Sequence, residues 1–198
     1  MGNTNTSNET LRWFSSYLPF MADTPKIKVL VTGSSGFVGK ETVTLLESKG
    51  IEVIPFDIMN GRQDITDYQC LKEHIETYQP NRILHLAATA RFDDARRNPE
   101  RATKTNYLGT DNIAKVSSEY HIPVVYSSTG TVYMPIKQEM PITEKFEVGE
   151  QISTYGRTKS LGELSIIRYC NPWIILRYGH LYGAEKRFLF IGVERAGL

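Results

Sequence analysis

The sequence predicts an α/β fold built on a doubly wound parallel sheet, and three observations point to it. Short runs rich in β-branched residues alternate with longer stretches whose apolar residues recur at helical spacing. Three glycines, Gly33, Gly36 and Gly39, follow the first such run at once. The chain has 198 residues, 40% of them hydrophobic, which is enough to bury a core. Repeated strand–helix units of this kind form a parallel sheet with helices on both faces.

The first predicted unit is a strand, a glycine turn and a helix. Residues 26–32 form a β-branched run, and residues 37–49 carry apolar side chains at helical spacing until the helix ends at Gly50. Residues 51–57 are again short, apolar and β-branched, so they are predicted as the second strand.

The middle of the chain repeats this pattern. A helix is predicted over residues 67–78, with Asp67 near its start. Residues 82–88 form a nearly continuous apolar run, which is typical of a strand buried on both faces. Residues 99–120 then supply one long helix.

The last predicted units are a strand over residues 121–128, a helix over 155–170 and a further strand over 172–177. The segment between the first two of these, residues 133–153, is long and contains two prolines. Long loops of this kind are usually functional, so we expect it to lie over the carboxyl edge of the sheet.

Charge and cysteine content exclude several kinds of partner. Acidic and basic side chains nearly cancel, at a formal net charge of +1, and no Lys/Arg block predicts binding of nucleic acid or of an acidic membrane. Cys70 and Cys170 lack CxxC spacing and a histidine cluster, so we expect no metal site, and reduced thiols in a cytoplasmic protein. No apolar run reaches the roughly 18–20 residues of a membrane-spanning helix.

The beginning of the chain differs in composition from the rest. Residues 1–25 are rich in Asn, Thr and Ser and precede the first predicted strand. We therefore expect a flexible N-terminal extension over residues 1–25, followed by one domain over residues 26–198.

The glycine turn predicts a dinucleotide site. It lies between a strand and a helix, so backbone amides and the helix N-terminus can face a pyrophosphate. Asp57 ends the second strand 24 positions beyond Gly33, where its carboxylate can accept hydrogen bonds from ribose hydroxyls. This favours NAD, because a carboxylate would repel the 2′-phosphate of NADP. The nearby Arg62 leaves NADP as the alternative.

A second pattern supplies hydroxyl groups and a proton donor. Residues 126–133 leave a strand with several hydroxyl side chains, one of which we expect to face the reacting carbon. Tyr155 and Lys159 are four apart on a predicted helix and so share one face. There, the ammonium group can lower the pKa of the phenol from about 10 toward neutrality. Tyr155 is therefore a candidate general acid/base.

In this order the motifs resemble the extended short-chain dehydrogenase/reductases, the NAD-dependent nucleotide-sugar epimerases, dehydratases and reductases. The resemblance covers roughly residues 26–185 and implies a Rossmann-like NAD(P)-binding domain over residues 26–198. The motifs that carry it are the glycine turn, residues 64–67, 85–88 and 106–110, the hydroxyl strand, Tyr155 and Lys159 with residues 162–163, and residues 176–183.

The resemblance also implies roles for individual residues. The catalytic group would be Thr129, Tyr155, Lys159 and Asn106, and the substrate would contact Thr129, Gly130 and His180. The cofactor would lie on Gly33, Ser35, Gly36, Phe37, Val38 and Gly39 at the pyrophosphate, on Asp57 at the ribose, on Asp64 and Ile65 at the adenine, and on Leu86, Ala87, Ala88, Tyr155 and Lys159 toward the nicotinamide.

Departures from the family pattern narrow the expected reaction. Thr129 is followed by Gly130 and Thr131, whereas dehydratases carry an acidic pair and decarboxylases a glutamate there. What remains is hydride transfer at a sugar carbon, by an isomerase such as a nucleotide-sugar epimerase or by an oxidoreductase of a keto-sugar. The spacing from Asp57 to residues 64–67 is similar to that of dTDP-4-dehydrorhamnose reductases. The resemblance also leaves a homodimer open.

The chain is shorter than members of that family, which continue well beyond the position of Leu198. We therefore expect the C-terminal substrate region to be largely absent. Two alternatives stay open: a non-catalytic NAD-binding regulator or fragment, and a reductase of another small carbonyl compound, since a fold does not fix a substrate.

Overall fold

The computed structural model describes residues 26–61, 63–134, 143, 148, 153–179 and 181, and the backbone of residues 192–197. The predicted N-terminal extension, Arg62, His180 and most of the predicted loop over residues 133–153 lie outside these described residues. What the sequence predicts for them stays a prediction.

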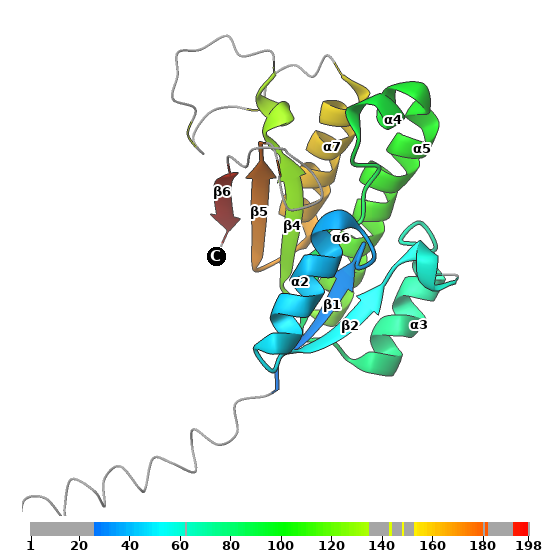
Figure 1. Ribbon diagram of the computed structural model, residues 1–198, viewed down its shortest axis with the longest axis vertical. Coiled ribbons are helices and arrows are strands. Elements are labelled where there is room, and N and C mark those ends of the chain that lie inside the picture. The colour runs from blue at the N-terminus through cyan, green and yellow to red at the C-terminus, as the bar shows by residue number, and fades with distance from the viewer. Residues whose placement is uncertain are drawn as a thin grey trace, which may run out of the picture.

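Within the described residues, one six-stranded sheet forms the centre of the molecule, in the order β2-β1-β3-β4-β5-β6 (Figure 1). Strands β1 to β5 are parallel, and β6 pairs antiparallel with β5. The strands are β1 (Lys28–Thr32), β2 (Glu52–Phe56), β3 (Arg82–His85), β4 (Val124–Thr129), β5 (Trp173–Tyr178) and β6 (Gly192–Gly197).

Helices cover both faces of the sheet. From β1 to β2 the chain moves toward one side of the sheet, and all later parallel connections move toward the other side. Because such connections are right-handed, α2 lies on one face of the sheet and α3, α6 and α7 lie on the other (Figure 1). The described helices are α2 (Phe37–Ser48), η1 (Ile58–Asn60), α3 (Tyr68–Tyr78), α4 (Phe92–Arg97), α5 (Pro99–Thr103), η2 (Lys104–Gly109), α6 (Thr110–Tyr120), η3 (Gly130–Tyr133) and α7 (Thr154–Tyr169). The doubly wound parallel fold is thus confirmed.

The core lies between the sheet and its helices. Strand side chains such as Leu30, Phe56 and Ile83 have almost no exposed surface and pack with Leu71 of α3 and Ile113 of α6 in one apolar cluster. Burial of such side chains contributes about 1.5–3 kcal/mol each. The strands that carry the expected site are therefore rigidly held.

Several elements differ from the prediction. The long helix predicted over residues 99–120 is α5, η2 and α6 in unbroken succession, with η2 a π-helix. Neither α4 nor the antiparallel strand β6 was predicted. Asp67 lies at the start of α3 as expected, and its carboxylate caps the helix by accepting a hydrogen bond from the Cys70 N–H. No helix among the described residues combines the length and the apolar character needed to cross a bilayer.

The strand order reverses beside β1. The chain passes from β1 to β2 on one side, and β3, β4 and β5 follow on the other. In open α/β sheets, ligands bind at the carboxyl ends of the strands at such a reversal. This edge is where the predicted site residues must meet if they act together.

Candidate functional site

The first glycine of the turn allows a close approach between β1 and the segment after β3. Gly33 has φ = 71°, and its N–H donates to the Phe56 carbonyl oxygen over 2.9 Å, which ties the end of β1 to β2. A Cβ atom at Gly33 would lie 2.7 Å from the backbone nitrogen of Ala87. Real side chains do not fit there, so the turn brings three strand ends together only because residue 33 is glycine.

The other two glycines bring the start of α2 against the turn. Gly36 precedes α2 and donates its N–H to the Gly33 carbonyl over 3.0 Å, and a Cβ at Gly39 would overlap that same carbonyl oxygen. Phe37 and Val38 occupy the first turn of the helix. The positive end of the α2 dipole therefore lies at the carboxyl edge of the sheet, as an anion site requires.

Asp57 lies beside this turn. One carboxylate oxygen accepts the Ser35 N–H over 3.0 Å, and the other accepts the Met59 N–H over 2.9 Å. The carboxylate is half-buried and keeps further lone pairs for a ligand hydroxyl, since each oxygen accepts two bonds. Ser35 and Asp57, both predicted site residues, are thus in direct contact.

Asp64 and Ile65, although adjacent in sequence, lie in different surroundings. Asp64 lines an open cavity of about 730 Å³ together with Tyr68 and Lys104. The Ile65 side chain instead packs in the core against Gly109 and is 4% exposed. Of the two residues expected at the adenine, only Asp64 lines this cavity.

The segment after β3 is held by a buried chain of hydrogen bonds. Leu86 donates its N–H to the Thr32 carbonyl, and the Ala87 N–H lies 3.3 Å from the Thr32 hydroxyl oxygen. That hydroxyl is 2.7 Å from His85 Nδ1, and His85 Nε2 is 3.0 Å from the Thr110 hydroxyl, which donates to a backbone carbonyl. His85 is fully buried, and burial lowers its pKa to about 3. The imidazole is therefore neutral and fixes the path of residues 86–88.

Asn106 joins the same edge from the π-helix η2. Its side chain accepts the Thr89 N–H over 2.7 Å and donates to the Thr89 carbonyl and the Thr158 hydroxyl. Asn106 is completely buried, so it clamps the segment after β3 to α7. A π-turn at such a point is common at functional sites.

Thr129, Tyr155 and Lys159 meet at the end of β4. Thr129 ends β4, and its hydroxyl lies close enough to the Tyr155 phenol to influence the pKa of that phenol. Lys159 donates from Nζ to the Ser127 carbonyl over 2.5 Å and lies 4.3 Å from the centroid of the Tyr126 ring. Three of the four predicted catalytic side chains are thus gathered between β4 and α7.

The pKa values at this site differ from the expectation. Burial raises the pKa of Tyr155, and the nearby Thr129 hydroxyl opposes that rise. Burial lowers the pKa of Lys159 to about 7, and the Glu163 carboxylate opposes that fall. The predicted lowering of the phenol's pKa by Lys159 is wrong for this structure, because desolvation dominates at Tyr155 and the amine contacts β4.

The expected substrate contacts are only partly described. Gly130 begins η3 directly after Thr129, and a Cβ there would make ordinary contact with the Tyr178 carbonyl at 3.4 Å. His180 lies outside the described residues.

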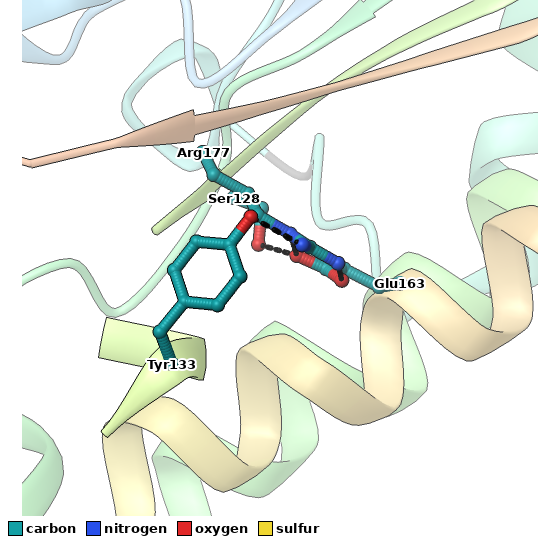
Figure 2. A network of polar contacts seen from close by, with 4 residues as sticks. All are labelled: Ser128, Tyr133, Glu163 and Arg177. Atoms are coloured by element: carbon teal, nitrogen blue, oxygen red, sulfur yellow. Dashed lines mark hydrogen bonds and ion pairs between the residues drawn. The ribbon is translucent and has the colours of Figure 1, made fainter. Parts of the chain in front are cut away.

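One buried network at this edge was missed by sequence reasoning. Arg177 on β5 makes two bonds to Glu163 on α7, at 2.9 and 2.6 Å, and a third to the Tyr133 hydroxyl at 2.6 Å (Figure 2). The Ser128 hydroxyl donates to Glu163 Oε1 over 2.5 Å. The signal was present in the motifs at residues 162–163 and 176–183, but a charged residue in a sequence does not show its burial.

Comparison with known proteins places these features in a family context. A family model for the RmlD substrate binding domain matches residues 27–196. The UDP-glucose 4-epimerase of Caenorhabditis elegans is 29% identical over an alignment of 205 positions, which covers 86% of this chain and 58% of that enzyme. Three curated relatives are covered over 58%, 54% and 50% of their length, so the chain spans about half the length of such proteins.

Solved structures give the same result. The dTDP-4-dehydrorhamnose reductase of Bacillus anthracis, in complex with NADP, matches with a TM-score of 0.73 and 28% identity over 81% of this chain and 56% of that one. The UDP-glucose 4-epimerase of Thermus thermophilus, in complex with NAD, matches with a TM-score of 0.69 and 28% identity over 81% and 58%.

Proposed function

Because the chain belongs to the RmlD substrate binding domain family, we propose that it is an NAD(P)-dependent nucleotide-sugar epimerase or keto-sugar reductase. The observation that carries this proposal is the grouping of Thr129, Tyr155 and Lys159 at the edge of the sheet where the glycine turn lies. Relatives of both reaction types match the chain, so the two reactions stand together.

The fit of a dinucleotide is supported by the turn itself. At Gly33 and Gly39 a Cβ would collide with backbone, so nothing larger than glycine permits this turn, and the α2 N-terminus can hold a pyrophosphate. Asp57 can accept the ribose hydroxyls, which favours NAD, with NADP as the alternative. When bound, the nicotinamide supplies hydride exchange with a sugar carbon.

In the proposed mechanism the protein moves the proton and orients the oxygen. Tyr155 exchanges a proton with the sugar oxygen, and the Thr129 hydroxyl, which lies near the phenol, orients that oxygen. Lys159 would hold the nicotinamide ribose when the cofactor is bound and, with a pKa of about 7, can pass a proton toward Tyr155. Burial keeps the phenol protonated at neutral pH, which is the form that donates to a keto oxygen during reduction.

Substitution of Tyr155 tests this proposal. Tyr155→Phe should lower kcat by about 10²–10⁴, because a positioned acid/base contributes that much, and should leave the Kd for NAD unchanged. Tyr120→Phe, which removes an exposed hydroxyl bonded to Glu76, is the matched control and should retain activity. The measurement is turnover of UDP-, GDP- and dTDP-sugars with calorimetry of NAD and NADP. Full activity in Tyr155→Phe would remove Tyr155 from the mechanism.

The same panel separates the alternatives. Binding of NAD without turnover of any nucleotide sugar would favour a non-catalytic regulator or fragment, and turnover of other small carbonyl compounds alone would favour a different reductase. A homodimer is supported by the exposed Leu164 and Ile167 on α7, which are 60% and 37% exposed. Sedimentation equilibrium would decide it. A cytoplasmic location stays a prediction.

A further inference from the structure

Three side chains of α7 contact three consecutive residues of β4. They are spaced four apart, so they share one face of the helix, and the contacts join the helix to the carboxyl end of the strand. The pairs are Tyr155 with Thr129, Lys159 with Ser127, and Glu163 with Ser128. The first two pairs belong to the proposed catalytic group, and Glu163 is the member without a role in it.

Glu163 is fixed more tightly than its neighbours. Its two oxygens accept the paired bonds from Arg177, and one of them also accepts the Ser128 hydroxyl (Figure 2). The side chains of Glu163 and Arg177 are 2% and 0% exposed. A planar guanidinium that binds a carboxylate through two donors leaves that carboxylate little freedom. Its position relative to the rest of α7 is therefore defined.

The carboxylate is also the nearest buried anion to Lys159 on the helix, one turn away. The titratable and charged groups around this amine are Tyr155 and Glu163 on α7, Tyr126 on β4, His85 on β3 and Arg177 on β5. Tyr126 and Tyr155 are neutral phenols and His85 is neutral, because burial disfavours their charged forms. The Tyr126 ring can attract a charged Lys159 through its face, but of these groups Glu163 alone offers the amine an opposite charge.

We propose that Glu163, held by Arg177 and Ser128, is a positioning residue for Lys159: its fixed carboxylate, one turn along the buried face of α7, favours the charged form of the amine. Bonded to Arg177, the carboxylate is shared between two cations and does not neutralise Lys159 fully, so the amine can both gain and lose a proton near neutral pH. The catalytic meaning of this inference rests on the proposed function, but the titration of Lys159 does not.

The test is the titration midpoint of Lys159 in the whole chain. Carbon-13 labelled lysine gives one NMR signal per side chain, and the signal lost in Lys159→Met identifies residue 159. Glu163→Gln should lower the midpoint by about one pH unit, since it removes an opposite charge close to the amine. Glu163→Asp keeps the charge and should return the midpoint toward that of the wild type.

Two further variants keep the test decisive. If Glu163→Gln does not fold, because Arg177 loses its partner, the double variant Glu163→Met with Arg177→Met removes the pair without leaving a buried charge. Its midpoint should also be lowered, but by less than in Glu163→Gln, because the positive charge of Arg177 is removed as well. Glu73→Gln removes an exposed carboxylate from α3 and should leave the midpoint unchanged.

An unchanged midpoint in both Glu163→Gln and the double variant would overturn the proposal, whatever the activity of the chain. A lowered midpoint supports it even if no nucleotide sugar is turned over, so failure of the proposed function is seen separately. Where turnover is found, its pH profile should move in the same direction as the midpoint.

Discussion

Lys159 shows how a single buried side chain links stability to chemistry. Only 2% of its surface is exposed, and its amine is satisfied by one carbonyl and one aromatic ring. Moving an ammonium group out of water costs free energy, so burial lowers the pKa of Lys159 to about 7. An amine that titrates near neutral pH is useful for proton transfer and unfavourable for folding.

Because burial of the Lys159 amine disfavours folding, Lys159→Met should be more stable than the wild type, by an amount that depends on pH. The pKa is about 7 when folded and 10.5 ordinarily, so the unfolded chain binds more protons between these values and wild-type stability rises with pH across that window. Below pH 7 the full cost is present, on the order of a few kcal/mol. The variant should therefore be more stable than the wild type at pH 6, and the difference should shrink by pH 10.

Urea denaturation at pH 6, 8 and 10 measures this difference directly. Lys40→Met removes an exposed ammonium group from α2 and should differ little from the wild type at any of the three values. A gain in Lys159→Met that stays constant with pH would mean that the amine is not desolvated in the folded protein.

At the scale of elements, the glycine turn between β1 and α2 predicts a difference between two glycines. Gly33 and Gly50 both have positive φ, at 71° and 73°, but a Cβ at Gly33 meets the Ala87 backbone at 2.7 Å, whereas at Gly50 nothing lies within 4 Å. Gly50→Ala should lower the free energy of unfolding by about 1–2 kcal/mol, because alanine is strained in the left-handed conformation. Gly33→Ala should cost several kcal/mol more, because rigid backbone must also move.

The measurement is the free energy of unfolding of both variants at one pH, with NAD calorimetry as a second readout. Gly33→Ala should lose NAD affinity, and Gly50→Ala, at the opposite end of α2, should keep it. Equal losses of stability in the two variants would show that the close approach to Ala87 does not constrain the turn.

Some elements followed from the sequence and others could not. The parallel strands and the Asp67 cap were predictable because hydrophobic period and capping chemistry are local. The π-helix η2 was not, since it depends on Asn106 reaching Thr89 and Thr158, which are distant in sequence. The short helix α4 and the strand β6 were missed for the same reason: their pattern is weak, and tertiary contacts decide it.

The candidate site was likewise predictable only in part. The order of motifs predicted that Thr129, Tyr155 and Lys159 would meet, and they do. It could not predict the pKa directions, because these depend on burial rather than on spacing. Nor could it show that Glu163 and Arg177 form a buried pair, since charged residues are usually exposed.

At the scale of the whole molecule, the strand order fixes where a ligand must act. Order β2-β1-β3 brings the glycine turn, Asp57 and the segment after β3 to one edge, although they are far apart in sequence. The amino ends of the same strands, with Gly50 and Asn81, lie at the opposite edge. The sheet therefore separates the edge at which we propose that the cofactor binds from the edge that carries Gly50 and Asn81.

Hydrogen exchange with and without NAD tests this separation. Binding should slow exchange at residues 33–39, 57–60 and 86–89, because a ligand that bridges these strand ends stabilises the folded state as a whole and covers their amides. Residues 49–51 and 79–81 at the opposite edge should change least. AMP alone should protect the first two segments and not the third, because it lacks the nicotinamide half of the dinucleotide. Protection confined to the amino edge would contradict the placement of the cofactor at the strand reversal, and with it the reaction that is proposed there.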